Sequence, residues 1–180
     1  MRIAAPDSAL LLIDLQERLT PVIHDHERIL LNCGKLLQAA RRLKIPLAVT
    51  EHCPEAIGYS LPQLREHLAA EEIYCKRHFG AADEMPFRER ISNLGRQQWI
   101  LCGVEAHVCL LQTALGLRRM EKDVFIVADA TGSRKDENRL MALERLRGAG
   151  CIVVTTEMVL FEWLEHADNP AFKEVLRLIK

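Results

Sequence analysis

The sequence has no long hydrophobic run and no excess of charge of either sign. None of its apolar stretches approaches the about 18–20 residues that a membrane-spanning helix needs. Its 24 lysine and arginine residues nearly balance 25 aspartate and glutamate residues, which leaves a net charge of -1. This balance gives no electrostatic reason to expect a nucleic acid or a membrane as a partner.

A secretion signal and a metal-binding cysteine pattern are missing as well. Residues 1–16 lack the long apolar segment and the small-residue cleavage site of a signal peptide, so we expect a cytoplasmic protein. The six cysteines form no C-x-x-C pair and show no zinc-finger spacing. Scattered cysteines of a cytosolic chain are mostly small buried side chains. We interpret five of the six in this way: Cys33, Cys53, Cys75, Cys102 and Cys151.

The chain does contain a regular alternation of two patterns. Its 180 residues predict one domain over residues 1–180, with enough length to bury a core. Apolar, β-branched runs predict strands over residues 9–14, 47–50, 72–75, 99–102, 124–128 and 152–154. Amphipathic stretches predict helices over residues 26–44, 87–95, 106–121, 136–150, 155–167 and 170–180. Thr155 or Thr156 is the expected cap of the fifth helix.

This alternation predicts an α/β fold, in which helices cover both faces of a parallel sheet. The predicted strands are continuously apolar, as in strands that are buried on both sides. Functional side chains in such folds gather at the carboxyl ends of the strands, near the point where the strand order reverses. The longest irregular segment, Glu51 to Leu68, is expected to form an active-site lid or an interface element.

Three reactive side chains follow this rule. Asp14 ends the run ALLLID, Lys76 ends EEIYCK, and Cys109 lies six residues beyond Gly103 at the opening of a helix. Each has an ordinary structural explanation by itself: a turn cap, a lysine that reaches solvent and a packed helix-face cysteine. Together they bring an acid, a base and a thiol to the ends of the first, third and fourth strands, which favours one catalytic site.

Each of the three groups has a chemical task in such a site. The Asp14 carboxylate takes the thiol proton, and the Lys76 ammonium and the helix N-terminus are expected to favour a Cys109 thiolate. Backbone N–H groups at the helix start hold a developing oxyanion. The set therefore predicts nucleophilic catalysis by a cysteine.

Five segments carry a resemblance to a known family: LLIDLQ, CKRHFGA, GVEAHVCLLQTAL, VADATGSR and FKEVLRLIK. On these segments the chain resembles the isochorismatase-like cysteine hydrolases, a superfamily that includes nicotinamidases and N-carbamoylsarcosine amidohydrolases. The resemblance covers essentially the whole chain, and the segment around Cys109 is quite specific. It is closest to the branch of isochorismatase domain-containing proteins.

The resemblance implies a three-layer α/β/α fold around a six-stranded parallel sheet in the order 3-2-1-4-5-6. It implies that Asp14 is the general base and that Lys76 tunes the thiol and the bound substrate. Cys109 then attacks the scissile carbonyl and forms an acyl-enzyme. A non-proline cis peptide is implied between Val104 and Glu105, where it would aim the Glu105 N–H, with that of Cys109, at the oxyanion.

One departure from the family concerns a metal. Nicotinamidases bind a metal through a D-x-H motif and a further histidine after the second strand. This chain reads VTEHCPEAIGYS at that place and offers only His52. We therefore expect no metal and no cofactor, and the departure argues against a nicotinamidase. The expected substrate is a small amide or a related small molecule.

Several other residues have two interpretations each. Tyr59, His78 and Phe79 are candidates for lining the substrate pocket, although packing in the core or the lid also explains Tyr59 and Phe79. His107 precedes Cys109 by two residues, but positions i and i+2 of a helix point to different faces, which argues against a Cys–His dyad.

Three titratable side chains are interpreted as surface groups. His24 and His26 resemble a metal pair within IHDHER, but they lie in a charged helix entry. Arg134 has the chemistry to bind an anion, yet an exposed loop charge is the commoner case.

Two further functional classes stay open. One is a non-catalytic relative of the fold that serves as an assembly or binding partner, and the other is a thiol redox sensor. The intact set of Asp14, Lys76 and Cys109 favours the hydrolase, and no resolving cysteine lies beside Cys109 in the sequence. The resemblance implies a homo-oligomer, such as a dimer or tetramer, for which Phe161 and Trp163 would supply an apolar contact.

Overall fold

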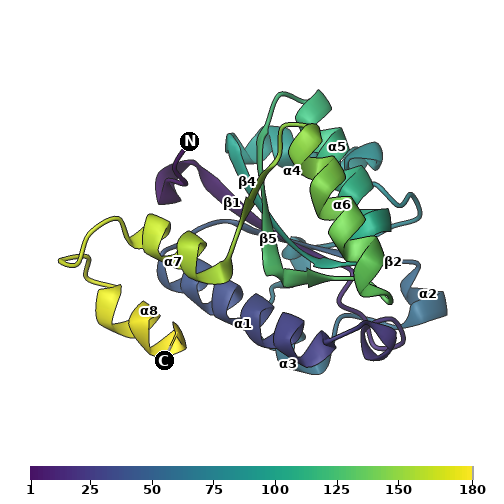
Figure 1. Cartoon of the computed structure of the whole chain (residues 1–180), viewed down its shortest axis with the longest axis horizontal. Coiled ribbons are helices and arrows are strands. Elements are labelled where there is room, and N and C mark those ends of the chain that lie inside the picture. The colour runs from purple at the N-terminus through teal and green to yellow at the C-terminus, as the bar shows by residue number, and fades with distance from the viewer. Residues whose placement is uncertain (180) are drawn as a thin grey trace.

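A six-stranded parallel sheet forms the centre of the fold in the computed structural model, which describes residues 1–179 (Figure 1). The strands are β1 (Ser8–Ile13), β2 (Leu47–His52), β3 (Ile73–Lys76), β4 (Gln98–Val104), β5 (Asp123–Gly132) and β6 (Ile152–Val154). They lie in the order β3-β2-β1-β4-β5-β6, and all neighbours are parallel. The predicted fold class, strand order and six strands are therefore confirmed.

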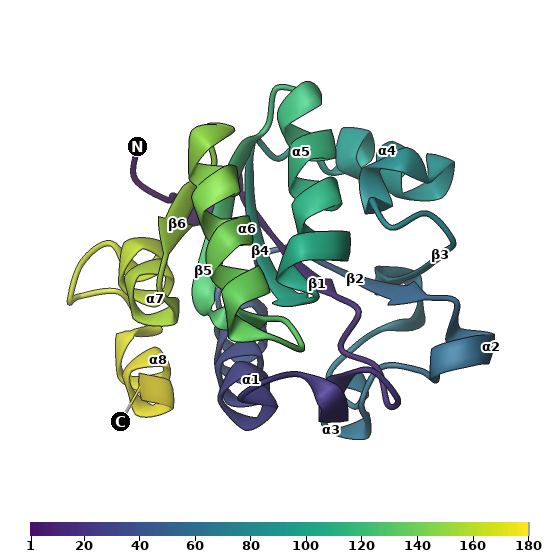
Figure 2. The same cartoon turned by 45° about the vertical axis from the view of Figure 1, so that its right-hand side comes forward.

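Helices cover both faces of this sheet (Figures 1 and 2). On one face lie α1 (His26–Arg42), α7 (Thr156–Leu164) and α8 (Phe172–Ile179), whose apolar side chains form one buried cluster with the strands. On the other face lie α4 (Met85–Leu94), α5 (Leu111–Arg119) and α6 (Asp136–Gly148), which build a second cluster. Within residues 1–179 no helix combines the length and apolar character that crossing a membrane requires.

Some boundaries differ from the predicted ones. The segment Glu51 to Leu68 is not wholly irregular, because it contains the end of β2 and two one-turn helices, α2 (Pro54–Ile57) and α3 (Pro62–Arg65). The last helix begins at Phe172 instead of Pro170, and its predicted last residue, Lys180, lies outside the described residues. The helix predicted over residues 106–121 opens with a π-helical turn, Ala106–Leu110, before α5. Short 3-10 turns occur at Ala5–Asp7, Thr20–Val22, Ala70–Glu72 and Ala81–Asp83.

The start of α7 confirms one of the two predicted caps. The Thr155 hydroxyl accepts a hydrogen bond from the N–H of Met158 at 3.3 Å, so Thr155 caps the helix. Trp163 in the same helix is only 2% exposed, and its indole N–H donates to Ser8 Oγ at 3.0 Å. The prediction that Trp163 supplies an oligomer contact is therefore wrong, because its ring is part of the core. Phe161, in contrast, is 43% exposed.

The strand order reverses between β1 and β4, whose carboxyl ends lie side by side. Ile13 of β1 is the register partner of Gly103 in β4. A Cβ atom at Gly103 would lie 2.2 Å from the Ile13 carbonyl oxygen, and the φ of Gly103 is +115°, which L side chains rarely adopt. Glycine therefore allows the two backbones to approach closely, immediately before Asp14.

We expect Gly103→Ala to lower the free energy of unfolding by about 2–4 kcal/mol, because the new Cβ clashes with the Ile13 carbonyl and the positive φ strains the backbone. Urea unfolding followed by circular dichroism measures the change. Gly34→Ala in α1 is the matched control, since nothing lies within 4 Å of its Cβ. Helix propensity predicts stabilisation of this control by about 0.5–1 kcal/mol. Wild-type stability in Gly103→Ala would contradict the close approach.

Candidate active site

The three predicted catalytic side chains meet at the carboxyl edge of the sheet. Asp14 follows the last residue of β1, Lys76 is the last residue of β3, and Cys109 lies in the π-helical turn after β4. Asp14 is 0% exposed, Lys76 3% and Cys109 6%. Lys76 Nζ lies 2.8 Å from Asp14 Oδ2, and both charged groups act on the Cys109 thiol. The structure brings the three residues together, while their catalytic roles stay a prediction.

Oxygen atoms surround the Lys76 ammonium. Besides the ion pair with Asp14, Nζ donates hydrogen bonds to the carbonyl oxygens of His78 at 3.3 Å and Phe79 at 3.1 Å. Asp14 Oδ2 lies close to Nζ but accepts no hydrogen bond of ordinary geometry from residues 1–179. The contact between Lys76 and Asp14 is therefore an ion pair in which Oδ2 retains lone pairs for another donor.

The Cys109 thiol is held in its neutral form. Burial raises the pKa of Cys109 to about 12, the Asp14 carboxylate acts in the same direction, and the Lys76 ammonium opposes both. Lys76 favours the thiolate, as expected, but removal from water outweighs this effect, so the net shift is opposite to the expected one. The Asp14 carboxylate and the Lys76 ammonium both lie beside the thiol.

The backbone just before Cys109 has its own polar contacts. The peptide bond between Val104 and Glu105 is cis, and the Glu105 N–H donates to no backbone carbonyl of residues 1–179. The buried Glu105 carboxylate accepts a hydrogen bond from the Arg134 backbone N–H at 2.9 Å and pairs with the Arg134 guanidinium at 3.2 Å. Arg134 is an exposed loop residue, as predicted, and its guanidinium pairs with the Glu105 carboxylate.

A second carboxylate, Glu84, organises the loop that holds Lys76. Glu84 Oε1 accepts hydrogen bonds from the backbone N–H groups of Arg77 at 2.8 Å and His78 at 2.9 Å, and it lies 2.9 Å from His78 Nδ1. The hydrogen bond from the His78 N–H, followed by that from Arg77, lowers the pKa of Glu84 to about 2. These bonds hold residues 77–79 in the turn that directs two carbonyl oxygens at Lys76.

Two of the predicted pocket residues lie next to Lys76. His78 and Lys76 line a cavity of about 500 Å³, but the His78 imidazole is directed at Glu84. Phe79 is 50% exposed, and its ring packs against that of His52 with centroids 5.2 Å apart. His52 is the register partner of Lys76 across β2 and β3. His52 and Phe79 therefore form a packed pair of rings next to Lys76.

Tyr59, the third predicted pocket residue, lies in a different recess. It is 50% exposed and shares a cavity of about 370 Å³ with Glu51 and Arg65. The Arg65 guanidinium lies 4.9 Å from the centre of the Tyr59 ring, a cation–π contact. No member of the triad lines this cavity. A substrate-binding role of Tyr59 stays a prediction that this arrangement does not favour.

The remaining histidine interpretations agree with the structure. His107 Nδ1 lies 3.0 Å from Ser133 Oγ, and Nε2 lies 3.4 Å from Asn138 Nδ2, so the imidazole engages these residues and not the Cys109 thiol. His24 is exposed and His26 is half-buried at the entry to α1.

Five cysteines were interpreted as small buried side chains, and the structure divides them. Cys33, Cys102 and Cys151 are buried, as predicted. The interpretation is wrong for Cys75, which is exposed, and for Cys53, which is half-buried. Cys75 lies on β3, an edge strand with a neighbour on one side only, and Cys53 immediately follows β2, the strand beside it.

The described residues provide few candidate ligands for a metal ion. No group of three or more His, Cys, Asp or Glu side chains that suits a metal occurs in residues 1–179. Burial, and next the Lys76 ammonium, lower the pKa of His52, so its imidazole is neutral near pH 7. The absence of a metal and of a cofactor stays a prediction.

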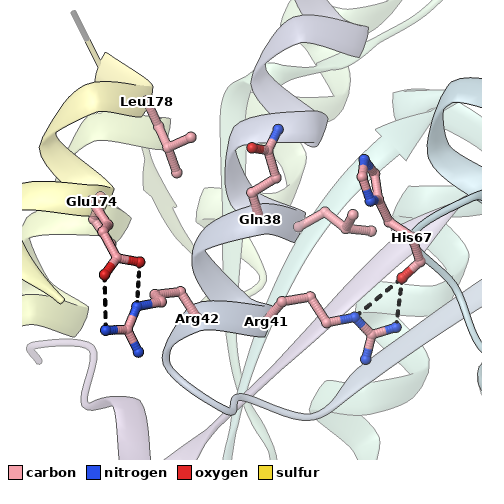
Figure 3. Close-up of a pocket in the computed structure, with 8 residues that line it drawn as sticks. Gln38, Arg41, Arg42, His67, Glu174 and Leu178 are labelled. Atoms are coloured by element: carbon pink, nitrogen blue, oxygen red, sulfur yellow. Dashed lines mark hydrogen bonds and ion pairs between the residues drawn. The ribbon is translucent and has the colours of Figure 1, made fainter.

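A separate groove lies between α1 and α8 (Figure 3). It has a volume of about 480 Å³ and is lined by Leu37, Gln38, Arg41, Arg42, His67, Glu174, Val175 and Leu178. Both arginines already have partners: Arg42 pairs with the Glu174 carboxylate at 2.5 and 3.0 Å, and Arg41 donates to the His67 carbonyl at 2.7 and 3.1 Å. None of the triad residues lines this groove, so it is not part of the candidate active site.

Sequence reasoning missed three polar residues around the triad: Thr50, Glu84 and Gln16. The Thr50 hydroxyl donates to Asp14 Oδ1 at 2.7 Å. Gln16 Nε2 donates to the His52 carbonyl at 3.0 Å, and Gln16 Oε1 accepts from the His52 N–H at 2.7 Å. Thr50 and Gln16 are both 0% exposed. Thr50 and Gln16 could have been found from the sequence, because each is a polar residue at or just beyond the end of an apolar strand. Glu84 has no such feature.

Comparison with known proteins identifies the family to which this chain is similar. Residues 8–158 match the family model described as Isochorismatase domain. The chain is 39% identical over 181 aligned positions to isochorismatase domain-containing protein 2 of Danio rerio, covering 99% of this chain and 89% of the relative.

Solved structures with the same fold include relatives of different names. MAR1 ribonuclease from Caenorhabditis elegans is 37% identical, with a TM-score of 0.94, and the match covers 99% of this chain and 92% of that one. The YcaC gene product of Escherichia coli, an octameric hydrolase of unknown specificity, is 26% identical with a TM-score of 0.93, over 99% and 89% of the two chains. YcaC from Pseudomonas aeruginosa, solved with covalent acrylamide, is 25% identical with a TM-score of 0.92, over 98% and 91%.

We expect the pH profile of Cys109 alkylation by iodoacetamide to have a midpoint above the about 8.5 of an unperturbed thiol, because burial raises the pKa of Cys109. Asp14→Asn should lower this midpoint, because it removes the carboxylate that disfavours a thiolate. Lys76→Met should raise it. Mass spectrometry of peptides follows each cysteine separately, and exposed Cys75 is the internal comparison. A wild-type midpoint below about 8.5 would contradict the dominance of burial.

We expect Glu84→Gln to lower the free energy of unfolding at pH 7 by about 1–3 kcal/mol, because it weakens charge-assisted hydrogen bonds to the 77–79 turn. The pKa of Glu84 is lowered from 4.5 to about 2, so the charged side chain stabilises the fold above pH 4.5, and this stabilisation is lost as the pH falls toward 2. The difference between the variant and the wild type should therefore shrink over that range.

Urea unfolding at several pH values measures this difference. Glu89→Gln is the matched control, since Glu89 is exposed on α4, the helix that Glu84 immediately precedes. A difference for Glu84→Gln that stays constant from pH 7 to pH 2, or an equal loss in the control, would refute the role of the Glu84 carboxylate.

Proposed function

Because this chain belongs to the isochorismatase family, we propose that it is a cysteine hydrolase that cleaves a C–N bond of a small amide or related molecule through a covalent acyl-enzyme. Family membership supports a hydrolase. The buried set of Asp14, Lys76 and Cys109, with its 2.8 Å ion pair, is the observation that carries the finer proposal.

Acylation begins with a neutral thiol. Because the pKa of Cys109 is about 12, its proton leaves as the sulfur attacks, and Asp14 Oδ2 receives it. Sγ forms a bond to the carbonyl carbon, and the carbonyl π electrons move onto the oxygen. The Lys76 ammonium offsets the negative charge of the Asp14 carboxylate and of the developing oxyanion.

Collapse of this intermediate breaks the C–N bond. Asp14 returns the proton to the leaving nitrogen, which departs as an amine or ammonia, and the acyl group remains on Sγ as a thioester. Water then attacks the thioester carbonyl while Asp14 takes a proton from it. Cys109 leaves as a thiol by recovering that proton, and the carboxylic acid product is released.

The oxyanion is proposed to face the backbone N–H groups of Glu105 and Cys109. The family resemblance implies this arrangement, and the Glu105 N–H has no backbone carbonyl partner within residues 1–179. Arg134 supports it indirectly, because it holds the Glu105 side chain through two hydrogen bonds. No metal or cofactor is assigned to the reaction, since the metal motif of nicotinamidases is absent from the segment after β2.

A small substrate fits this site better than a polymer. The nematode relative is called a ribonuclease, but here the candidate nucleophile is only 6% exposed and lies against a buried ion pair. The net charge of -1 provides no attraction for a polyanion. The proposed partner is therefore a small molecule and not a nucleic acid.

Self-association and location stay predictions. The octameric state of the Escherichia coli relative supports a homo-oligomer for this chain, without deciding between a dimer, a tetramer and a larger assembly.

We expect p-nitrophenyl acetate, an activated ester, to acylate Cys109 and release p-nitrophenolate in a burst of one equivalent. Mass spectrometry should find one acetyl group on the Cys109 peptide after acid quenching. Cys109→Ser and Asp14→Asn should lower the acylation rate by at least about 100-fold. A panel of small primary amides, with ammonia release as the measurement, then searches for the substrate.

Cys75→Ser is the matched control, because Cys75 is more exposed but lies outside the triad. It should acylate as fast as the wild type. An unchanged burst in Cys109→Ser would refute the proposed nucleophile and favour a non-catalytic binding protein.

A further inference from the structure

We propose that Thr50 is a positioning residue for the reaction: its hydroxyl occupies one oxygen of Asp14 so that the other oxygen serves as the base toward Cys109. This inference rests on the proposed function and assigns a task to a residue outside the triad. It follows from the separate surroundings of the two carboxylate oxygens.

The two residues are linked twice. Thr50 lies on β2 as the register partner of Ile13, the residue before Asp14. The Asp14 N–H donates to the Thr50 carbonyl at 3.1 Å, and the Thr50 hydroxyl donates to Asp14 Oδ1 at 2.7 Å. The backbone of Asp14 has a φ of +52°, so the chain turns away from the strand at this residue. The double link holds the turned carboxylate in place.

The hydroxyl makes the carboxylate asymmetric. Oδ1 accepts the Thr50 hydrogen bond, whereas Oδ2 lies 2.8 Å from Lys76 Nζ and accepts no hydrogen bond of ordinary geometry from residues 1–179. Asp14 and Thr50 are both 0% exposed, so water is not at hand to replace a missing donor. Without the hydroxyl, Oδ1 and Oδ2 would compete for Lys76, and the carboxylate would rotate between them.

Such rotation affects the chemical step more than substrate binding. Proton transfer from Cys109 needs an acceptor oxygen at a fixed place and angle when the sulfur attacks. The hydroxyl donates its hydrogen bond to Asp14 Oδ1, so its loss acts on the site through the carboxylate. The expected signature is a lower acylation rate constant with an unchanged KM.

The test measures p-nitrophenyl acetate acylation of the purified protein at pH 7 to 8. Thr50→Val keeps the size of the side chain and removes the hydroxyl, and it should lower the acylation rate constant by about 10- to 100-fold with KM within about twofold. Thr50→Ser restores a hydroxyl and should stay within about threefold of the wild type. Thr131→Val is the matched control, because Thr131 is buried and its hydroxyl has no partner within residues 1–179.

A double-mutant cycle separates positioning from a structural effect. Thr50→Val should change nothing further in an Asp14→Asn background, since its effect passes through the carboxylate. Wild-type acylation by Thr50→Val, or an equal loss with and without Asp14, overturns this inference alone. Absence of any Cys109-dependent acylation in the wild type overturns the proposed function, and the proposed role of Thr50 is then refuted as well.

Discussion

The buried ion pair between Asp14 and Lys76 is the interaction on which the candidate active site depends. Both charges are removed from water, so each needs compensation from fixed neighbours. Asp14 obtains it from the Thr50 hydroxyl and the ammonium, and Lys76 obtains it from two backbone carbonyls in the turn that Glu84 holds. Loss of any one of these partners therefore leaves a buried charge without full compensation. These polar residues depend on one another for this reason.

The same burial decides how the thiol works. A thiolate beside Lys76 is the usual expectation for a reactive cysteine, yet removal from water and the Asp14 charge keep Cys109 protonated. In the proposed mechanism the nucleophile therefore forms during the attack, with the proton passing to a base already in place. That mechanism assigns proton transfer to Asp14 and electrostatic stabilisation to Lys76.

Much of the fold was predictable because its signals are local. Apolar runs and amphipathic stretches repeat in strict alternation, and such a pattern has few solutions other than a parallel sheet with helices on both faces. Asp14, Lys76 and Cys109 stood out because each follows or ends an apolar run. Burial of single side chains was less predictable: Trp163 is in the core and Cys75 is exposed, since both depend on which face of an element another element covers.

By itself the sequence determined the order of strands and helices, the family and the three residues at the strand ends, because these depend on patterns between near neighbours and on motifs. Only the tertiary structure decided what surrounds those residues. Thr50 and Glu84 reach the site from β2 and from the start of α4, and no local pattern announces a hydrogen bond between residues 36 positions apart. The protonation state of the Cys109 thiol likewise depends on the tertiary structure, because its pKa depends on burial and on charges that folding brings from distant parts of the chain.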